Sequence, residues 1–164
     1  RVPTMVFRLA QPGMLIDLNG SAEWFGSAVD GDGLRSGAMT RQRTVERSAA
    51  VAQLAPLVAE AMPDIAHPQI RNRGTFGGSI AHNDPAAELP ALMTVLGAQM
   101  RVQGAGGERL LPAAEFFQGL FTTAMEPEEL LVEILIPRLP PRTGTAFEEV
   151  ARRHGDYAMA GAAA

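Results

Sequence analysis

The sequence predicts an α+β fold, in which strands and helices are mixed without a regular alternation of strand, helix and strand. Three observations support this prediction. Short apolar runs are bounded by glycine, proline and asparagine, apolar residues near 51–61 have helical spacing, and residues 130–136 close in an apolar run at Pro137. The 164 residues are enough for one sizeable core or for one domain with an appendage.

The first expected elements are strands. The run MLIDL at residues 14–18, bounded by Pro-Gly and Asn-Gly, predicts a buried strand. Residues 24–29 and 34–38 flank the turn-forming sequence DGDG at residues 30–33, which predicts a β-hairpin.

Two helices are expected next. Thr40 is a candidate N-cap for a helix over residues 41–48, because its hydroxyl can accept a hydrogen bond from a free N–H at the helix start. A second, amphipathic helix is expected to end at Pro63, with apolar positions at Val51, Leu54, Leu57, Val58 and Ala61.

The second half of the chain predicts further elements. Residues 80–81 are interpreted as a brief strand, and Asp84-Pro85 as the start signal of a helix over residues 86–96. A second hairpin is expected from residues 99–103 and 109–111, a strand from residues 130–136, and a linker from the proline-rich residues 138–144.

A pair of glycines suggests a phosphate site. Gly77 and Gly78 can adopt backbone angles that turn successive N–H groups toward one point, which is the geometry of an anion-binding nest. The hydroxyls of Thr75 and Ser79 and the positive charges of Arg71 and Arg73 would add to it. The alternative is a glycine turn with solvated arginines.

Missing residue types exclude several chemistries. The chain has no cysteine, so it carries no cysteine-ligated iron–sulfur cluster, catalytic thiol or disulfide. Every basic residue is arginine, which excludes a Schiff-base lysine and a P-loop lysine. His67, His82 and His154 lack the spacing of metal ligands. Any redox group of this chain must therefore be a bound organic cofactor.

Charge and hydropathy bound the partners and the location. A net charge of −4 without a basic stripe argues against nucleic acid. No apolar run reaches the roughly 18 residues of a spanning helix, and no signal peptide is recognisable, so we expect a cytoplasmic protein without membrane insertion.

Several segments, in the same order along nearly the whole chain, resemble the FAD-binding medium subunit of molybdenum hydroxylases, the carbon monoxide dehydrogenase and xanthine dehydrogenase family. They are VPTMVFRLAQPGMLIDLNG, GLRSGAMTRQRTVERS, RNRGTFGGSIAHNDPAAELPAL, PEELLVEILIP and AFEEVARRHGDYAMAGAAA. The resemblance implies the two-subdomain FAD-binding fold of the vanillyl-alcohol-oxidase (PCMH) type.

The same resemblance implies a domain organisation. Residues 1–137 would form the FAD-binding domain without its N-terminal part, residues 138–145 a linker, and residues 146–164 the start of a C-terminal α+β domain. The family's first flavin loop, of the type AGGxS, would stand directly before the segment matched by residues 2–12 and is not in the sequence.

The resemblance also implies cofactor-binding residues. Glu88 would point toward the adenosine or ribose end, with a solvated first-turn helix residue as the alternative. Leu131 would present an aliphatic side chain to the flavin, with core packing as the alternative. Backbone contacts to the FAD diphosphate would come from the family's TxGG(N/S) loop, which here is Thr75, Phe76, Gly77, Gly78 and Ser79. Phe76 departs from the usual aliphatic residue of that loop, and no catalytic or metal-binding residue is expected.

The last segment carries a family signature. Arg152, Arg153 and Asp156 match RR..D.A, and an arginine there could offset negative charge on a reduced flavin or form only a surface salt bridge. Glu148 stands where many members carry lysine, so no role is assigned to it.

Three further residues have no assigned function. His82 could transfer a proton beside the flavin or be a hydrogen-bonded structural residue. The sole tryptophan, Trp24, and the sole tyrosine, Tyr157, are expected in cores.

The implied function is electron transfer. FAD on this chain would accept electrons from iron–sulfur clusters on a small partner subunit and pass them to an external acceptor, while a large partner subunit carries the molybdenum cofactor. The alternatives are a stand-alone flavin-dependent oxidoreductase of the same fold and a flavin-free interaction module.

Overall fold

A computed structural model describes residues 5–8, 11–31 and 33–164 of the chain. Residues 1–4, 9–10 and 32 lie outside the described residues, and with them part of the segment over residues 2–12 and one residue of the expected turn at 30–33.

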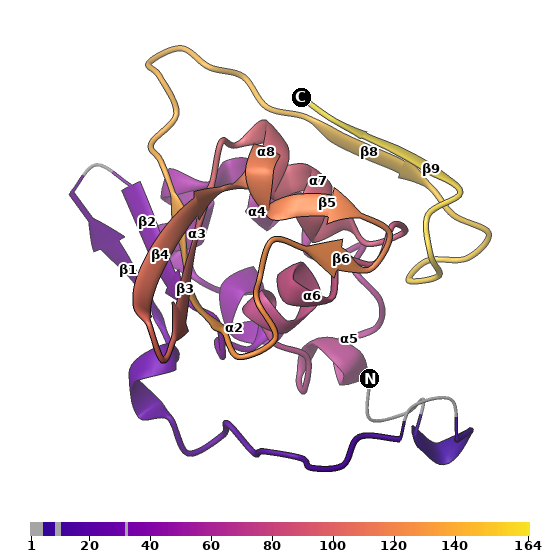
Figure 1. The fold of residues 1–164 in the computed structure, drawn as a ribbon. Helices are drawn as coiled ribbons and strands as arrows, with labels where there is room; N and C mark the ends of the chain where they lie inside the picture. Colours follow the sequence, from indigo (N-terminus) through magenta and orange to yellow (C-terminus); the bar gives the residue numbers. More distant parts are fainter. Residues whose placement is uncertain (1–4, 9–10, 32) are drawn as a thin grey trace.

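The centre of the fold is a five-stranded antiparallel sheet with helices on one face (Figure 1). The strands lie in the order β1-β2-β7-β3-β4. Their bounds in that order are Ser27–Asp30, Gly33–Gly37, Leu130–Ile136, Gln99–Gly104 and Gly107–Pro112.

Strand β7 is central because its side chains alternate between a buried and a polar face. Ile134 lies opposite Ser36 on β2 and Met100 on β3, and all three side chains are buried. On the other face, Glu133 pairs with Arg35 at 3.5 Å and with Arg101 at 3.3 Å. One face of the sheet therefore packs on the helices and the other carries charge.

Short helices cover the buried face. Their bounds are Ala22–Trp24 for the 3₁₀-helix η1, Gln42–Glu46 for α2, Ala49–Leu54 for α3, Pro56–Ala61 for α4, Pro68–Arg71 for α5, Phe76–His82 for α6, Glu88–Val95 for α7 and Ala113–Phe116 for α8. The core between helices and sheet includes the fully buried Leu57, Met62, Phe76, Ile80 and Phe116.

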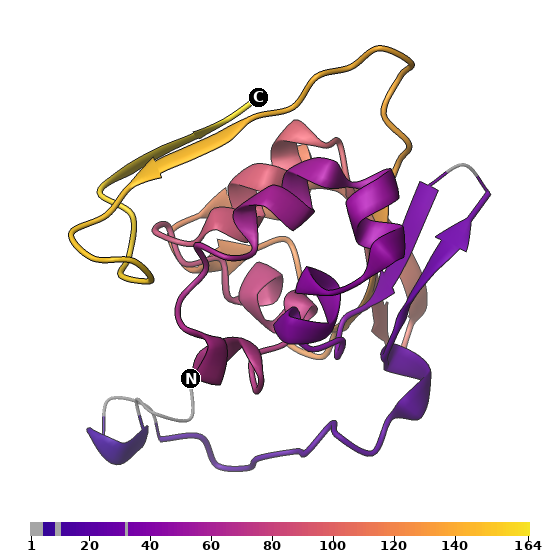
Figure 2. The same ribbon diagram turned by 180° about the vertical axis from the view of Figure 1, so that it is seen from behind.

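Two small hairpins complete the fold. β5 (Phe117–Gly119) pairs with β6 (Thr122–Thr123), and β8 (Phe147–Val150) pairs with β9 (Ala160–Ala163). The β8–β9 hairpin lies on the far side of the helices from the sheet, and both views show the helices between the two (Figures 1 and 2). Because β8 contacts α4 and β9 contacts α7, the end of the chain closes over the helical layer.

Most of the expected strands are confirmed. Both hairpins form, as β1–β2 and β3–β4, and β7 ends directly before Pro137 as expected. These segments could be predicted because period-two polarity and turn glycines are local signals. Residues 137–146 contain no helix or strand, while the proposed linker and domain bounds stay predictions.

Two helix predictions were wrong in detail. The N-cap of α2 is Arg41, and the Thr40 hydroxyl instead donates a 2.9 Å hydrogen bond to the carbonyl oxygen of Gly26. The expected single helix over residues 51–61 is two helices, because Pro56 starts α4 and the preceding Ala55 has non-helical angles.

Two predicted strands do not form. Residues 14–18 have no strand partner, and their apolar side chains are exposed, Met14 by 77%. Residues 80–81 belong to helix α6, which Thr75 caps.

Two smaller expectations were also wrong. Helix α7 begins at Glu88, two residues after the expected start, because Asp84 caps the preceding turn through the N–H of Ala86. Tyr157 is 70% exposed, and Trp24 is half-buried, so neither lies in the core. No helix in the described ranges has both the length and the apolar character needed to cross a membrane.

Candidate functional site

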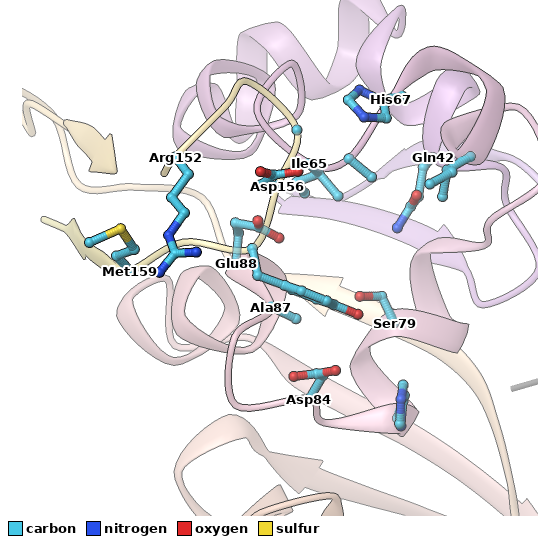
Figure 3. Close-up of a pocket in the computed structure, with 15 residues that line it drawn as sticks. Gln42, Ile65, His67, Ser79, Asp84, Ala87, Glu88, Arg152, Asp156 and Met159 are labelled. Atoms are coloured by element: carbon cyan, nitrogen blue, oxygen red, sulfur yellow. The ribbon is translucent and has the colours of Figure 1, made fainter. Parts of the chain in front are cut away.

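A cavity of about 640 Å³ opens between three segments that are distant in sequence. One wall comes from residues 65–70, the second from residues 79–88 on α6 and the start of α7, and the third from residues 152–159. Figure 3 shows Ser79, Asp84 and Glu88 facing the same space as Arg152 and Asp156. The cavity lies on the helical side of the molecule, away from the polar face of the sheet.

The glycine pair forms the first turn of helix α6. Thr75 caps this helix by accepting a hydrogen bond from the Gly78 N–H at 3.1 Å. The Phe76 N–H donates to the Thr40 carbonyl oxygen at 2.8 Å, and the Gly77 N–H donates to the Ala38 carbonyl oxygen at 2.9 Å. The expected nest of free N–H groups is therefore wrong, because protein acceptors already use these donors.

The predicted cofactor-binding residues do not all lie at the cavity. Ser79 and Glu88 line it, and Gly78 is exposed at the start of the same helix as Ser79. Phe76 and Leu131 are buried in the hydrophobic core instead. Core packing accounts for the position of Leu131, and its contact with a flavin stays a prediction.

Arg71 and Arg73 do not converge on the glycines. Arg71 is buried and pairs with Glu46 at 2.9 Å, while Arg73 is exposed. The carbonyl of Arg73 accepts a hydrogen bond from the Arg41 guanidinium at 2.6 Å. The expected positive charge of Arg71 beside a phosphate is therefore wrong.

Glu88 is the most perturbed titratable group of the cavity. Burial raises the pKa of its carboxyl to about 7, against a hydrogen bond from its own backbone that lowers it. The negative charges of Glu149, Asp64 and Asp84 raise the pKa further. Near neutral pH the Glu88 carboxyl can therefore either donate or accept a hydrogen bond. The alternative of a fully solvated helix residue is wrong.

His82 and its neighbour Asn83 connect the cavity to the β5–β6 hairpin. The His82 ring lines the cavity and lies 5.2 Å from the ring of Phe121, centroid to centroid. Asn83 has left-handed backbone angles, and its side-chain amide donates to the carbonyl oxygens of Gly119 and Thr122, both at 2.8 Å. Sequence reasoning missed this role of Asn83, although asparagine is typical of such a helix end.

The third wall rests on the first. Gly155 has a φ of 83°, and a β-carbon placed on it would lie 2.5 Å from His67 Nδ1. Of the arginine pair, Arg152 lines the cavity, and Asp156 and Tyr157 line it too. Sequence reasoning missed the wall at residues 65–70, where the only local signal was the helix-starting Pro68.

The cavity fits the FAD that the resemblance implies. Apolar side chains such as Ile65, Ile70 and Met159 suit a flat aromatic ring, and the Ser79 hydroxyl and the His82 ring can hydrogen-bond to polar groups. Glu88 can bond to a hydroxyl, and the guanidinium of Arg152 is a cation that an anionic group would favour. Among the residues that the structure describes, no three histidine, cysteine, aspartate or glutamate side chains could hold a metal ion.

Comparisons with known proteins give consistent matches. The family described as "FAD binding domain in molybdopterin dehydrogenase" matches residues 1–139. The chain is 43% identical over 162 residues to the 6-hydroxypseudooxynicotine dehydrogenase complex subunit alpha of Paenarthrobacter nicotinovorans, covering 99% of this chain and 55% of the relative. It is 43% identical to the carbon monoxide dehydrogenase medium chain of Hydrogenophaga pseudoflava, covering 99% and 56%.

Solved structures match equally well. A chain of carbon monoxide dehydrogenase from Hydrogenophaga pseudoflava superposes with a TM-score of 0.96 at 43% identity, covering 99% of this chain and 56% of that one. A chain of quinoline 2-oxidoreductase from Pseudomonas putida 86 superposes with a TM-score of 0.94 at 39% identity, with the same coverage. The chain thus spans about half the length of the relatives it matches.

Proposed function

The chain belongs to the family of FAD-binding domains of molybdopterin dehydrogenases, and from this premise we propose that it holds FAD in the cavity between residues 65–70, 79–88 and 152–159. The observation that carries the proposal is this cavity, which has apolar walls and a few convergent polar groups. The segment with the glycine pair forms one of its walls.

Several predictions from the sequence are confirmed. The family is the expected one, FAD is its cofactor, and the TM-score of 0.96 supports the PCMH-type fold. The relatives named above are oxidoreductase subunits, as predicted for the class of this chain.

Each wall has a proposed role in holding the cofactor. Ser79, next to the capped start of α6, would bond the diphosphate through its hydroxyl, and Gly78 would allow close approach because it is exposed and has no side chain. Glu88 would bond ribose hydroxyls. Arg152 would offset negative charge, and the apolar wall at Ile65 would exclude water. When bound, FAD supplies the capacity to accept and release electrons, while these residues bind and orient it.

We also propose that the complete protein is an electron-relay subunit of a molybdenum hydroxylase. Iron–sulfur clusters would reside on a small partner subunit, because this chain has no cysteine to ligate them. A large partner subunit would carry the molybdenum cofactor and the substrate. The printed names "medium chain" and "complex subunit alpha" of relatives support a multi-subunit assembly. A cytoplasmic location stays a prediction.

The test of FAD binding is Gly78→Asp in the full-length protein, with Gly78→Asn as the matched control. Both side chains meet the Thr75 hydroxyl equally, but only aspartate adds negative charge near the proposed diphosphate. We expect the aspartate variant to retain about tenfold less FAD than the asparagine variant. The aspartate variant should unfold at no lower temperature without FAD, since a carboxylate near a helix N-terminus is favourable.

Equal FAD content in the two variants would show that no diphosphate lies at Gly78. A colourless, FAD-free full-length protein would favour the interaction module instead. Copurification with a cysteine-rich small subunit and a molybdenum subunit would support the relay, and solitary turnover of an alcohol would favour the stand-alone oxidoreductase.

A further inference from the structure

We propose that Arg71 is a positioning residue that fixes the wall at residues 63–67 and thereby determines how tightly FAD is held. The proposal rests on FAD binding in the cavity described above. Arg71 does not line the cavity itself, so its effect would pass through the wall.

Arg71 connects one carboxylate with three backbone carbonyls. Its side chain is only 4% exposed. Its Nε donates to Glu46 Oε2 at 2.9 Å, while its Nη1 donates to the carbonyl oxygens of Pro63, Ile65 and Ala66 at 3.1, 2.8 and 3.0 Å. Only the planar guanidinium fork can point in both directions at once, because a lysine ammonium is a single point donor.

The wall depends on these bonds for its conformation. Residues 63–67 lie between α4 and α5 and form no helix or strand of their own. Ala66 has a φ of 51°, a left-handed conformation that costs free energy for a residue with a β-carbon. Without Arg71, three carbonyl groups in a largely buried region would lose their donor. The guanidinium therefore holds a strained segment in place.

The wall in turn supports the opposite side of the cavity. Ile65, Ala66 and His67 line the cavity, and Gly155 packs directly on this segment. A β-carbon at Gly155 would lie 2.7 Å from the Ala66 carbonyl oxygen, which is the same oxygen that Arg71 bonds. A shift of the wall would therefore displace the turn at residues 152–157 and change the width of the cavity.

The role is geometric rather than electrostatic. Burial alone would raise the pKa of Glu46, but hydrogen bonds from Arg71 and Arg43 outweigh it and lower the pKa, so Glu46 is ionised at neutral pH. The charge of Arg71 is thus paired within the protein, at 2.9 Å from Glu46. It does not supply positive charge to the diphosphate.

The test compares Arg71→Lys and Arg71→Met with the control Arg43→Met in the full-length protein loaded with FAD. Arg43 shares the carboxylate of Glu46 at 2.6 Å but has no bond to the wall. The measurements are the rate constant of FAD release, the visible circular dichroism of the bound flavin and the thermal unfolding of the FAD-free protein. We expect both Arg71 variants to release FAD at least tenfold faster with an altered dichroism spectrum, and Arg43→Met to stay within about twofold of wild type.

A second variant keeps the proposal testable if Arg71→Met does not fold. Gly155→Ala disturbs the same wall from the opposite side and leaves the buried ion pair intact, and it should also release FAD faster. An Arg71→Lys protein with a lowered unfolding temperature but wild-type FAD release and dichroism would overturn the proposal, because Arg71 would then be merely structural. Wild-type protein that binds no FAD would overturn the proposed function as well.

Discussion

Gly77 packs against Ala38 so closely that no β-carbon fits between helix α6 and the end of strand β2, and its N–H donates to the Ala38 carbonyl oxygen at 2.9 Å. A glycine that belongs to a phosphate-loop motif is therefore required by packing in this fold. Its neighbour Gly78 is exposed, and a β-carbon there would meet only the side chain of Thr75. The two glycines have different structural reasons.

The first prediction separates these reasons. Gly77→Ala should lower the free energy of unfolding by about 1–3 kcal/mol, because the new methyl group meets backbone that cannot move aside. Gly78→Ala should be nearly neutral, since a gain of about 1 kcal/mol in helix propensity offsets a cap bond of similar size. Urea unfolding of the two variants measures the difference. Equal stabilities would contradict the packing argument.

The second prediction concerns Asn83, which holds the β5–β6 hairpin against α6. Asn83→Gly keeps the left-handed conformation but loses two side-chain hydrogen bonds, so we expect a loss of about 2 kcal/mol. Asn83→Asp should cost more, because a carboxylate would then face the carbonyls of Gly119 and Thr122. The check is thermal unfolding at neutral pH, where an aspartate variant as stable as the glycine variant would rule this out.

The third prediction is a pH dependence from Glu88. Its pKa is about 7 in the folded chain, above the ordinary value of 4.5, so the folded state binds more protons between these two values. Stability should therefore fall as pH rises from about 4.5 to 7 and should level off above that range. Glu88→Gln should reduce this slope, and the exposed Glu60→Gln should not.

Unfolding temperatures of the FAD-free protein between pH 5 and 8 measure the slope in each variant. Part of the slope should remain in Glu88→Gln, because burial and the charge of Asp64 also raise the pKa of Glu149. A slope in Glu88→Gln as steep as in wild type would show that Glu88 is not the titrating group.

The fourth prediction concerns the exposed apolar residues near the start of the chain. Met14→Ser and Ile16→Ser should change the free energy of unfolding of residues 1–164 by less than about 0.5 kcal/mol, because both side chains are exposed. Ile134→Ala in the core should cost about 2–5 kcal/mol in the same assay. A loss at Ile16 comparable with that at Ile134 would mean that Ile16 is buried in solution.

Strands could be predicted where their signal is local. Residues 130–136 show it best, because Ile134 and Glu133 point to opposite faces and Pro137 ends the strand. The same reasoning failed at residues 14–18, where an apolar run has no partner strand within the described residues. Apolar character predicts what a segment can bury, while the burial itself needs a second surface.

Helix α6 shows the opposite failure. Paired glycines favour a turn by intrinsic propensity, and the sequence was interpreted that way. The Thr75 cap and the close contact with Ala38 stabilise a helix in spite of that propensity. The direction of the Arg71 side chain could not be predicted either, since its partner Glu46 lies 25 residues earlier in the chain.

The sequence by itself determined the family, the cofactor and the alternation of the main sheet, because these depend on motifs and spacings that are continuous in the chain. Only the tertiary structure decided which residues share a cavity. Segments 65–70, 79–88 and 152–159 meet because the β8–β9 hairpin folds back over the helices. The raised pKa of Glu88 and the buried position of Arg71 follow from that meeting, since both depend on water excluded by residues distant in sequence.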